Sequence, residues 1–257
     1  MKKFCLMLAV ALMMSQSFLP AGQCADSSKP QSTPQPPAGR DAPWHPQGEP
    51  DKFEPPVIKK LSEGVFRVGS VTVNKPEEYI SAEGEINMDK GLVEYLACGP
   101  LGKLHESVLV LHAQPYHLQV AALLLGLEPG DNPLGKQGGS GIPQGDPVEI
   151  WVSWQSNHRK EVRRRAEDLI FNVKEKRAMS HTHWVYTGSE IIDGKFIAQS
   201  EQSIIATYHD PFALFDHPLA TGTDDTLYYA NEQTVPPKGT PITLIIKPSH
   251  TKKHKNP

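Results

Sequence analysis

The central part of the chain, residues 57–248, alternates short apolar or β-branched stretches with polar breaks. A period of two places every second side chain on the same face, which is typical of half-buried strands. The breaks are short and rich in glycine, asparagine and aspartate, as turns require. We therefore predict strands at residues 64–73, 78–86, 92–97, 104–111, 147–154, 184–189, 194–198, 203–208 and 241–247.

One segment, residues 115–127, follows a helical period instead. Its proline suits the first turn of a helix, and apolar residues cover nearly the whole circumference, so we predict a helix buried on most sides. The glycine-rich residues 131–146 then form a long loop. The predicted fold class is α+β: a mostly antiparallel β-sheet packed on one buried helix, with a few short helical turns.

The two ends of the chain differ from this central part. Lys2 and Lys3 precede the apolar residues 4–14, and small residues follow, which predicts a signal peptide over residues 1–24. Eleven apolar residues are too few to span a bilayer, which needs about 20. The proline-rich residues 25–56 are predicted to be a disordered tether, and the basic residues 249–257 a disordered tail. A single globular domain over residues 57–248 remains.

These ends place the protein outside the cytoplasm, in the periplasm or the extracellular space. The alternative is a lipoprotein anchored at Cys24, but Gln23 stands where a small residue is wanted. Loss of Lys2 and Lys3 changes the net charge from −3 to about −5, with 24 basic and 29 acidic residues left. We therefore expect no nucleic-acid partner and no transmembrane segment in the mature chain. The sequence does not identify a partner; an envelope-associated partner is the candidate.

A basic run at residues 159–165 interrupts this acidic balance. We interpret it as a solvated strand edge or hairpin limb, with an anion-binding patch as the alternative.

Cys98 is the cysteine that remains in the predicted mature chain. A lone thiol in an oxidising compartment is buried and inert, reactive, or a metal ligand. The short segment 99–102 predicts a hairpin, which would place Cys98 on one face with Lys103 and His105; a bulge would move it to the face of Glu106. Cys98 as nucleophile, His105 as base and Glu106 as the group that orients the base are thus candidates for a catalytic site.

His181 and His183 have the spacing of two metal ligands on one strand face. A third ligand is not identified by spacing, and the neighbouring candidates are His209, Asp210, Asp216 and His217. The sequence contains no complete hydrolase, zinc-protease or phosphate-loop motif, so no cofactor is identified.

Several segments resemble the YdjY-type domain of bacterial exported proteins, a family without an assigned activity. They are Glu94-Tyr-Leu-Ala-Cys98-Gly-Pro, Gly102-Lys-Leu-His-Glu-Ser, Leu123-Leu-Leu-Gly-Leu-Glu-Pro-Gly130, Trp184-Val-Tyr-Thr-Gly-Ser189, Asp224-Asp-Thr-Leu-Tyr-Tyr-Ala-Asn231 and Pro236-Pro-Lys-Gly-Thr-Pro-Ile242. The resemblance covers about residues 57–248. Two hypotheses follow: a ligand-binding or structural module of the cell envelope, or a cysteine-dependent enzyme or metal-binding protein that uses Cys98, His105 and Glu106.

Overall fold

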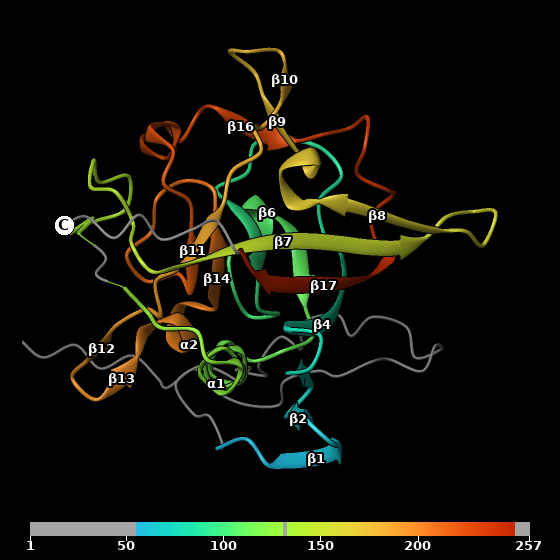
Figure 1. Ribbon diagram of the computed structural model, residues 1–257. Helices are drawn as coiled ribbons and strands as arrows, with labels where there is room; N and C mark the ends of the chain where they lie inside the picture. Colours follow the sequence, from blue (N-terminus) through green and yellow to red (C-terminus); the bar gives the residue numbers. More distant parts are fainter. Residues whose placement is uncertain (1–54, 131–132, 250–257) are drawn as a thin grey trace, which may run out of the picture. The chain divides into compact units, whose positions relative to one another are not determined.

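The computed structural model describes residues 55–130 and 133–249, and β-strands dominate it (Figure 1). The predicted signal peptide and most of the predicted tether and tail lie outside these residues. The strands are β1 (Ile58–Ser62), β2 (Val65–Val68), β3 (Val71–Asn74), β4 (Tyr79–Ile86), β5 (Tyr95–Cys98), β6 (Ser107–Leu111), β7 (Asp146–Gln155), β8 (Glu161–Arg165), β9 (Ile170–Asn172), β10 (Arg177–Ala178), β11 (Trp184–Tyr186), β12 (Ile191–Ile192), β13 (Lys195–Phe196), β14 (Ser203–Ala206), β15 (Phe215–Asp216), β16 (Tyr228–Ala230) and β17 (Pro241–Pro248).

The helices are few and short. The α-helices are α1 (Pro115–Leu125) and α2 (Ile197–Glu201), and the 3-10 helices are η1 (Leu104–Glu106), η2 (Ala166–Leu169) and η3 (Ala220–Thr223). Within the described residues, no helix has both the length and the hydropathy needed to cross a membrane.

The main sheet closes on itself into a barrel of eight strands. The strands follow the order β4-β17-β7-β11-β15-β14-β5-β6, and β6 pairs with β4 again. Most neighbours are antiparallel, whereas β5–β6 and β14–β15 are parallel. Alternate residues of β4, β17 and β7, such as Ala82, Leu244 and Val152, face the same core, as the period-two pattern requires.

The predicted α+β class, a mostly antiparallel sheet packed on one buried helix, is therefore wrong: the fold is mostly β and built around a closed barrel. β4 has two neighbours on one side: β3 pairs with Tyr79–Ser81, and β6 pairs with its end, from Gly84 to Ile86. The second pairing closes the barrel and leaves β1, β2 and β3 as an extension outside it. Alternating residues satisfy an open sheet and a barrel equally well, because both bury one face of each strand.

The predicted hairpin through residues 99–102 is also wrong. β5 and β6 run parallel, with Tyr95 opposite Ser107 and Cys98 opposite Val110. Gly102 N–H bonds to Gly99 O in a turn, and the chain then returns through η1 to begin β6 beside the start of β5. Every residue of both strands is buried, and such continuous burial is typical of parallel pairs covered on both faces.

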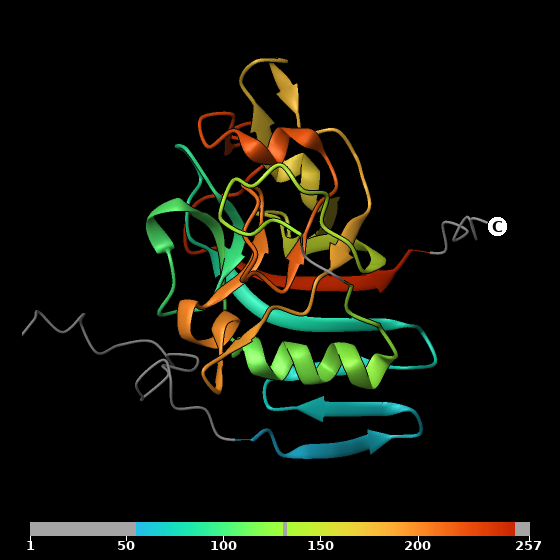
Figure 2. The same ribbon diagram turned by 90° about the vertical axis from the view of Figure 1, so that its left-hand side faces the viewer.

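α1 covers the extension rather than the centre of a sheet. It packs against β2, β3 and β4 and against α2, and Figure 2 shows it running alongside these strands. Its buried face contains Leu118, Ala121 and Ala122, whereas Leu123 is 50% exposed. The helix ends at Gly126 in the left-handed conformation, as a C-cap glycine commonly does. Four of the eleven residues of α1 are buried, six are partly buried and Leu123 is exposed, so neighbouring elements cover most but not all of its surface.

The long loop before β7 lies against the barrel. Gly138 N–H donates to His209 O at 2.7 Å, and Asp146 N–H donates to Glu128 O at 3.1 Å. The basic run forms β8, which pairs with β7 from Trp151 to Gln155, so its interpretation as a hairpin limb is confirmed.

Candidate functional site

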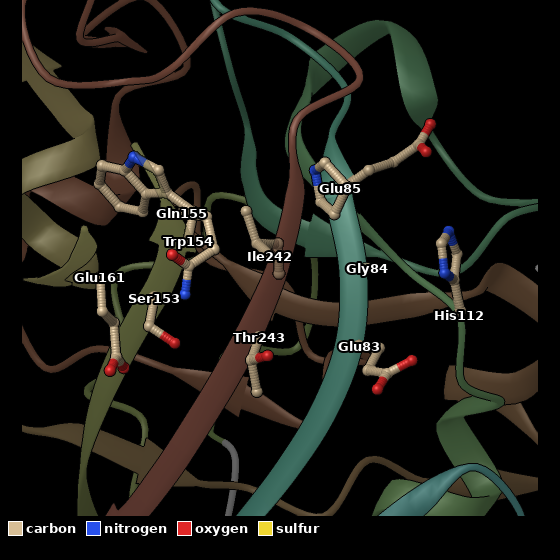
Figure 3. A pocket seen from close by; sticks show the side chains of 11 residues that line it. Glu83, Gly84, Glu85, His112, Ser153, Trp154, Gln155, Glu161, Ile242 and Thr243 are labelled. Atoms are coloured by element: carbon tan, nitrogen blue, oxygen red, sulfur yellow. The ribbon is translucent and has the colours of Figure 1, made fainter. Parts of the chain in front are cut away.

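An open groove crosses the outer face of β4, β17 and β7. Its volume is about 540 Å³, and in Figure 3 the three strands run side by side beneath it. It is lined by Glu83, Gly84, Glu85, His112, Ser153, Trp154, Gln155, Glu161, Pro241, Ile242 and Thr243.

Strand register explains why polar side chains meet here. Ala82 and Gly84 are buried in β4, so Glu83 lies on the other face. Glu83 pairs with Thr243 of β17, and Thr243 pairs with Ser153 of β7, which gives a polar row across three strands (Figure 3). The groove is thus a product of pairing between strands that are far apart in the sequence.

The groove is acidic. Its lining contains the three carboxylates of Glu83, Glu85 and Glu161, and His112 is its titratable nitrogen base. A smaller hollow of about 170 Å³ adjoins the groove and shares Glu83, His112 and Thr243 with it. Arg67 lines the smaller hollow but not the groove. Trp154 also lines the groove; it follows Ser153 and so lies on the opposite strand face, where it packs partly against the core. Such a lining can attract a cation and bond to hydroxyl groups.

A second polar cluster lies in the barrel wall around Tyr95, which is fully buried. The Tyr95 hydroxyl donates to Asp210 Oδ2 at 2.7 Å and accepts from Lys103 Nζ at 2.6 Å. The ammonium also lies 4.7 Å from the centre of the Tyr95 ring. Burial, and next the Asp210 carboxylate, raises the pKa of Tyr95, so this hydroxyl keeps its proton and links the lysine to the carboxylate.

Glu94 lies at the rim of this cluster. Gln137, from the long loop, donates to Glu94 Oε2 at 2.8 Å and to the Tyr95 hydroxyl at 3.3 Å. Burial, followed by the nearby Glu106 carboxylate, raises the pKa of Glu94. The long loop therefore takes part in the polar cluster around Tyr95.

A third cluster contains His209, Asp216 and His217, all of them buried. His209 Nδ1 lies 2.9 Å from Asp216 Oδ1. Asp216 Oδ2 accepts a bond from Asp210 N–H at 3.1 Å, which connects this cluster to the one around Tyr95. Within the described residues, these three side chains form the group with the composition and spacing of metal ligands.

The structure separates the candidate residues Cys98 and His105 by their surroundings. Cys98 is 1% exposed, and burial raises the pKa of its thiol to about 11, so the thiol is protonated at neutral pH. The His105 side chain is 80% exposed and lies 3.5 Å from the Glu106 carboxylate. Cys98 thus has the character of a buried small hydrophobe, and it lines neither of the two hollows described above.

His181 and His183 do not share a strand face, because β11 begins only at Trp184. His181 Nε2 bonds to Asp168 Oδ1 at 2.8 Å at the surface, and His183 is exposed. Three of the four neighbouring candidates, His209, Asp216 and His217, instead form a cluster of their own.

Sequence reasoning did not identify the groove. The alternation of Ala82, Glu83, Gly84 and Glu85 indicates a polar strand face, but nothing in it shows that β17 and β7 are the neighbours.

Comparison with known proteins gives one match. No curated protein and no solved structure matches the chain. The family of the YdjY domain matches residues 71–247, which confirms the resemblance inferred from the sequence segments. The match begins at β3 and ends in β17, so it includes all eight strands of the barrel. The chain therefore belongs to the YdjY domain family.

Proposed function

We propose that this protein is an exported module of the cell envelope that binds a ligand in the groove across β4, β17 and β7. The observation that carries the proposal is the groove itself, which has the volume of a small-ligand site and several polar side chains in its lining. A cysteine-dependent reaction has no comparable support, because the thiol of Cys98 is buried and protonated.

The lining favours a positively charged, hydroxylated ligand. Glu83, Glu85 and Glu161 complement an ammonium group, and the hydroxyls of Ser153 and Thr243 match sugar hydroxyls. Trp154 offers the aromatic face on which sugar rings and cations pack. An oligosaccharide with free amino groups combines these properties.

We expect the full-length protein to bind a glucosamine disaccharide, and to bind its N-acetylated form at least about tenfold more weakly, because acetylation removes the charge. Isothermal titration at low and high salt measures both affinities. High salt should weaken the binding of the charged glucosamine disaccharide. Trp154→Ala and the double variant Glu83→Gln/Glu161→Gln should each weaken binding by about tenfold or more.

The controls are Trp151→Ala and Glu201→Gln. Trp151 lies in the same strand but packs between Arg163 and Arg165 instead of lining the groove, and Glu201 lies in α2. Equal affinity for both disaccharides, or no binding at millimolar concentration, would contradict the proposed ligand. Equal losses of affinity in the groove variants and the controls would mean that the ligand does not bind in the groove.

Export is the second part of the proposal. The two lysines followed by the apolar residues 4–14 support a cleaved signal peptide. We expect protein made in a bacterial host to appear outside the cytoplasm with a mass that corresponds to a start at Ala25. Intact-mass spectrometry of the fractions checks this. A diacylglycerol adduct on Cys24 would favour the lipoprotein alternative, and exported protein that retains residues 1–24 unmodified would refute cleavage.

A further inference from the structure

We propose that His209, Asp216 and His217 form a binding site for a zinc-like transition metal ion, separate from the groove. The residues come from the ends of two neighbouring strands. β14 and β15 pair in parallel, with Ile205 opposite Phe215, so both strands end at the same edge. His209 follows β14, and Asp216 and His217 stand at the end of β15.

The spacing of the donor atoms suits one metal ion. One donor atom from each of the three residues lies within 4.8 Å of the other two, and the closest pair, His209 Nδ1 and Asp216 Oδ1, is 2.9 Å apart. Ligands at about 2.0–2.1 Å from a tetrahedral zinc ion are about 3.3 Å from one another. The cluster therefore needs only side-chain adjustments of the order of 1 Å.

Hydrogen bonds from neighbouring groups orient the donor atoms, as is usual for metal ligands. His217 Nε2 bonds to the carbonyl of Thr207 at 2.9 Å, which leaves Nδ1 as the nitrogen with the lone pair. Nδ1 accepts a hydrogen bond from Leu219 N–H at 3.2 Å, which a metal ion would have to replace.

The Asp216 carboxylate is oriented in the same way. It accepts bonds from the backbone N–H groups of His217 at 2.6 Å and Asp210 at 3.1 Å. The ring of His209 lies against Gly222, where an added Cβ atom would collide with it. These contacts preorganise the first shell.

The Asp216 carboxylate is fully buried, and it bonds to the His209 ring as well as to the two backbone N–H groups. Several donors or a cation can compensate a buried carboxylate. A divalent ion held by His209 and Asp216 would take the place of the proton between their side chains.

The test uses the full-length protein, unfolded in denaturant with a chelator and refolded with or without one equivalent of Zn²⁺ or Co²⁺. We expect about one ion per chain by elemental analysis, a higher melting temperature with Zn²⁺, and the visible absorption of tetrahedral Co²⁺. His209→Gln and His217→Gln should each reduce affinity by about 100-fold or more. The matched control, His181→Gln/His183→Gln, removes two exposed histidines and should retain the ion.

Wild-type protein decides the question even if the variants do not fold. If it refolds to the same melting temperature with and without metal and retains no ion, the cluster is a hydrogen-bonded network only. Loss of the ion from the His181→Gln/His183→Gln control would assign the metal to the surface pair. Either result would overturn the proposal.

Discussion

Replacing Gly84 by alanine is expected to lower the free energy of unfolding by about 3 kcal/mol. Gly84 lies in β4 opposite Leu111 of β6, at the seam that closes the barrel. An added Cβ atom would collide with the backbone oxygen of Val110 and lie 3.0 Å from Leu111 Cδ2. Because the Val110 oxygen belongs to the backbone of a fully paired strand, it cannot move aside without separating β4 from β6.

Chemical denaturation measures this effect, and Gly194→Ala is the control. Gly194 has open space around the position of a Cβ atom but a positive φ of 77°, so its replacement should cost only the conformational strain of about 1 kcal/mol. A Gly84→Ala variant as stable as the Gly194→Ala variant would mean that β4 and β6 do not approach so closely. The closed barrel would then be in question.

Replacing Tyr95 by phenylalanine should also destabilise the protein by about 3 kcal/mol, although the ring remains. The hydroxyl is the bridge between the Lys103 ammonium and the buried Asp210 carboxylate, at 2.6 Å and 2.7 Å. Removal of the hydroxyl leaves one oxygen of the buried Asp210 carboxylate without its donor. The free-energy cost of an unpaired buried charge is larger than the net stabilisation that the hydrogen bond provided.

A double-mutant cycle of Tyr95→Phe with Lys103→Met separates this linkage from simple packing. If the hydroxyl transmits the attraction between Lys103 and Asp210, the two changes should be coupled by about 1 kcal/mol or more. The matched control is Tyr229→Phe. Tyr229 occupies the half-buried position of β16, so its replacement should change stability by less than about 0.5 kcal/mol. Additive effects in the cycle would indicate that Lys103 contributes only through its contact with the ring.

The groove and the metal cluster lie in different parts of the fold. The groove residues Glu83, Ser153 and Thr243 lie on the outer strand face, so their replacement should leave the core intact, whereas Gly84 lies at the seam of the barrel. The metal cluster and the Tyr95 cluster share the bond from Asp210 N–H to Asp216, so changes in one are expected to affect the other. Ligand titrations and metal titrations on the same variants therefore report on separate parts of the molecule.

Local patterns determined much of the secondary structure. The stretch predicted at residues 78–86 forms β4, that at 241–247 forms most of β17, and the helix predicted at 115–127 is α1 with its end two residues earlier. Strand alternation, a proline at the helix start and a glycine at its end depend on neighbouring residues only, so a single sequence contains them. The segments around Cys98 and His105 likewise carried the family resemblance, which the match over residues 71–247 confirms.

Only the tertiary structure decided which strands are neighbours. β5 and β6 look like a hairpin in the sequence, yet they pair in parallel, and β4 meets β6 to close the barrel. Pairing depends on contacts between residues far apart in the chain, and a period of two fixes the face of a side chain but not the strand beside it. For the same reason, the sequence contains His209, Asp216, Glu83 and Ser153 as isolated polar residues. The register of the barrel brings the first two together inside and the last two together on its surface.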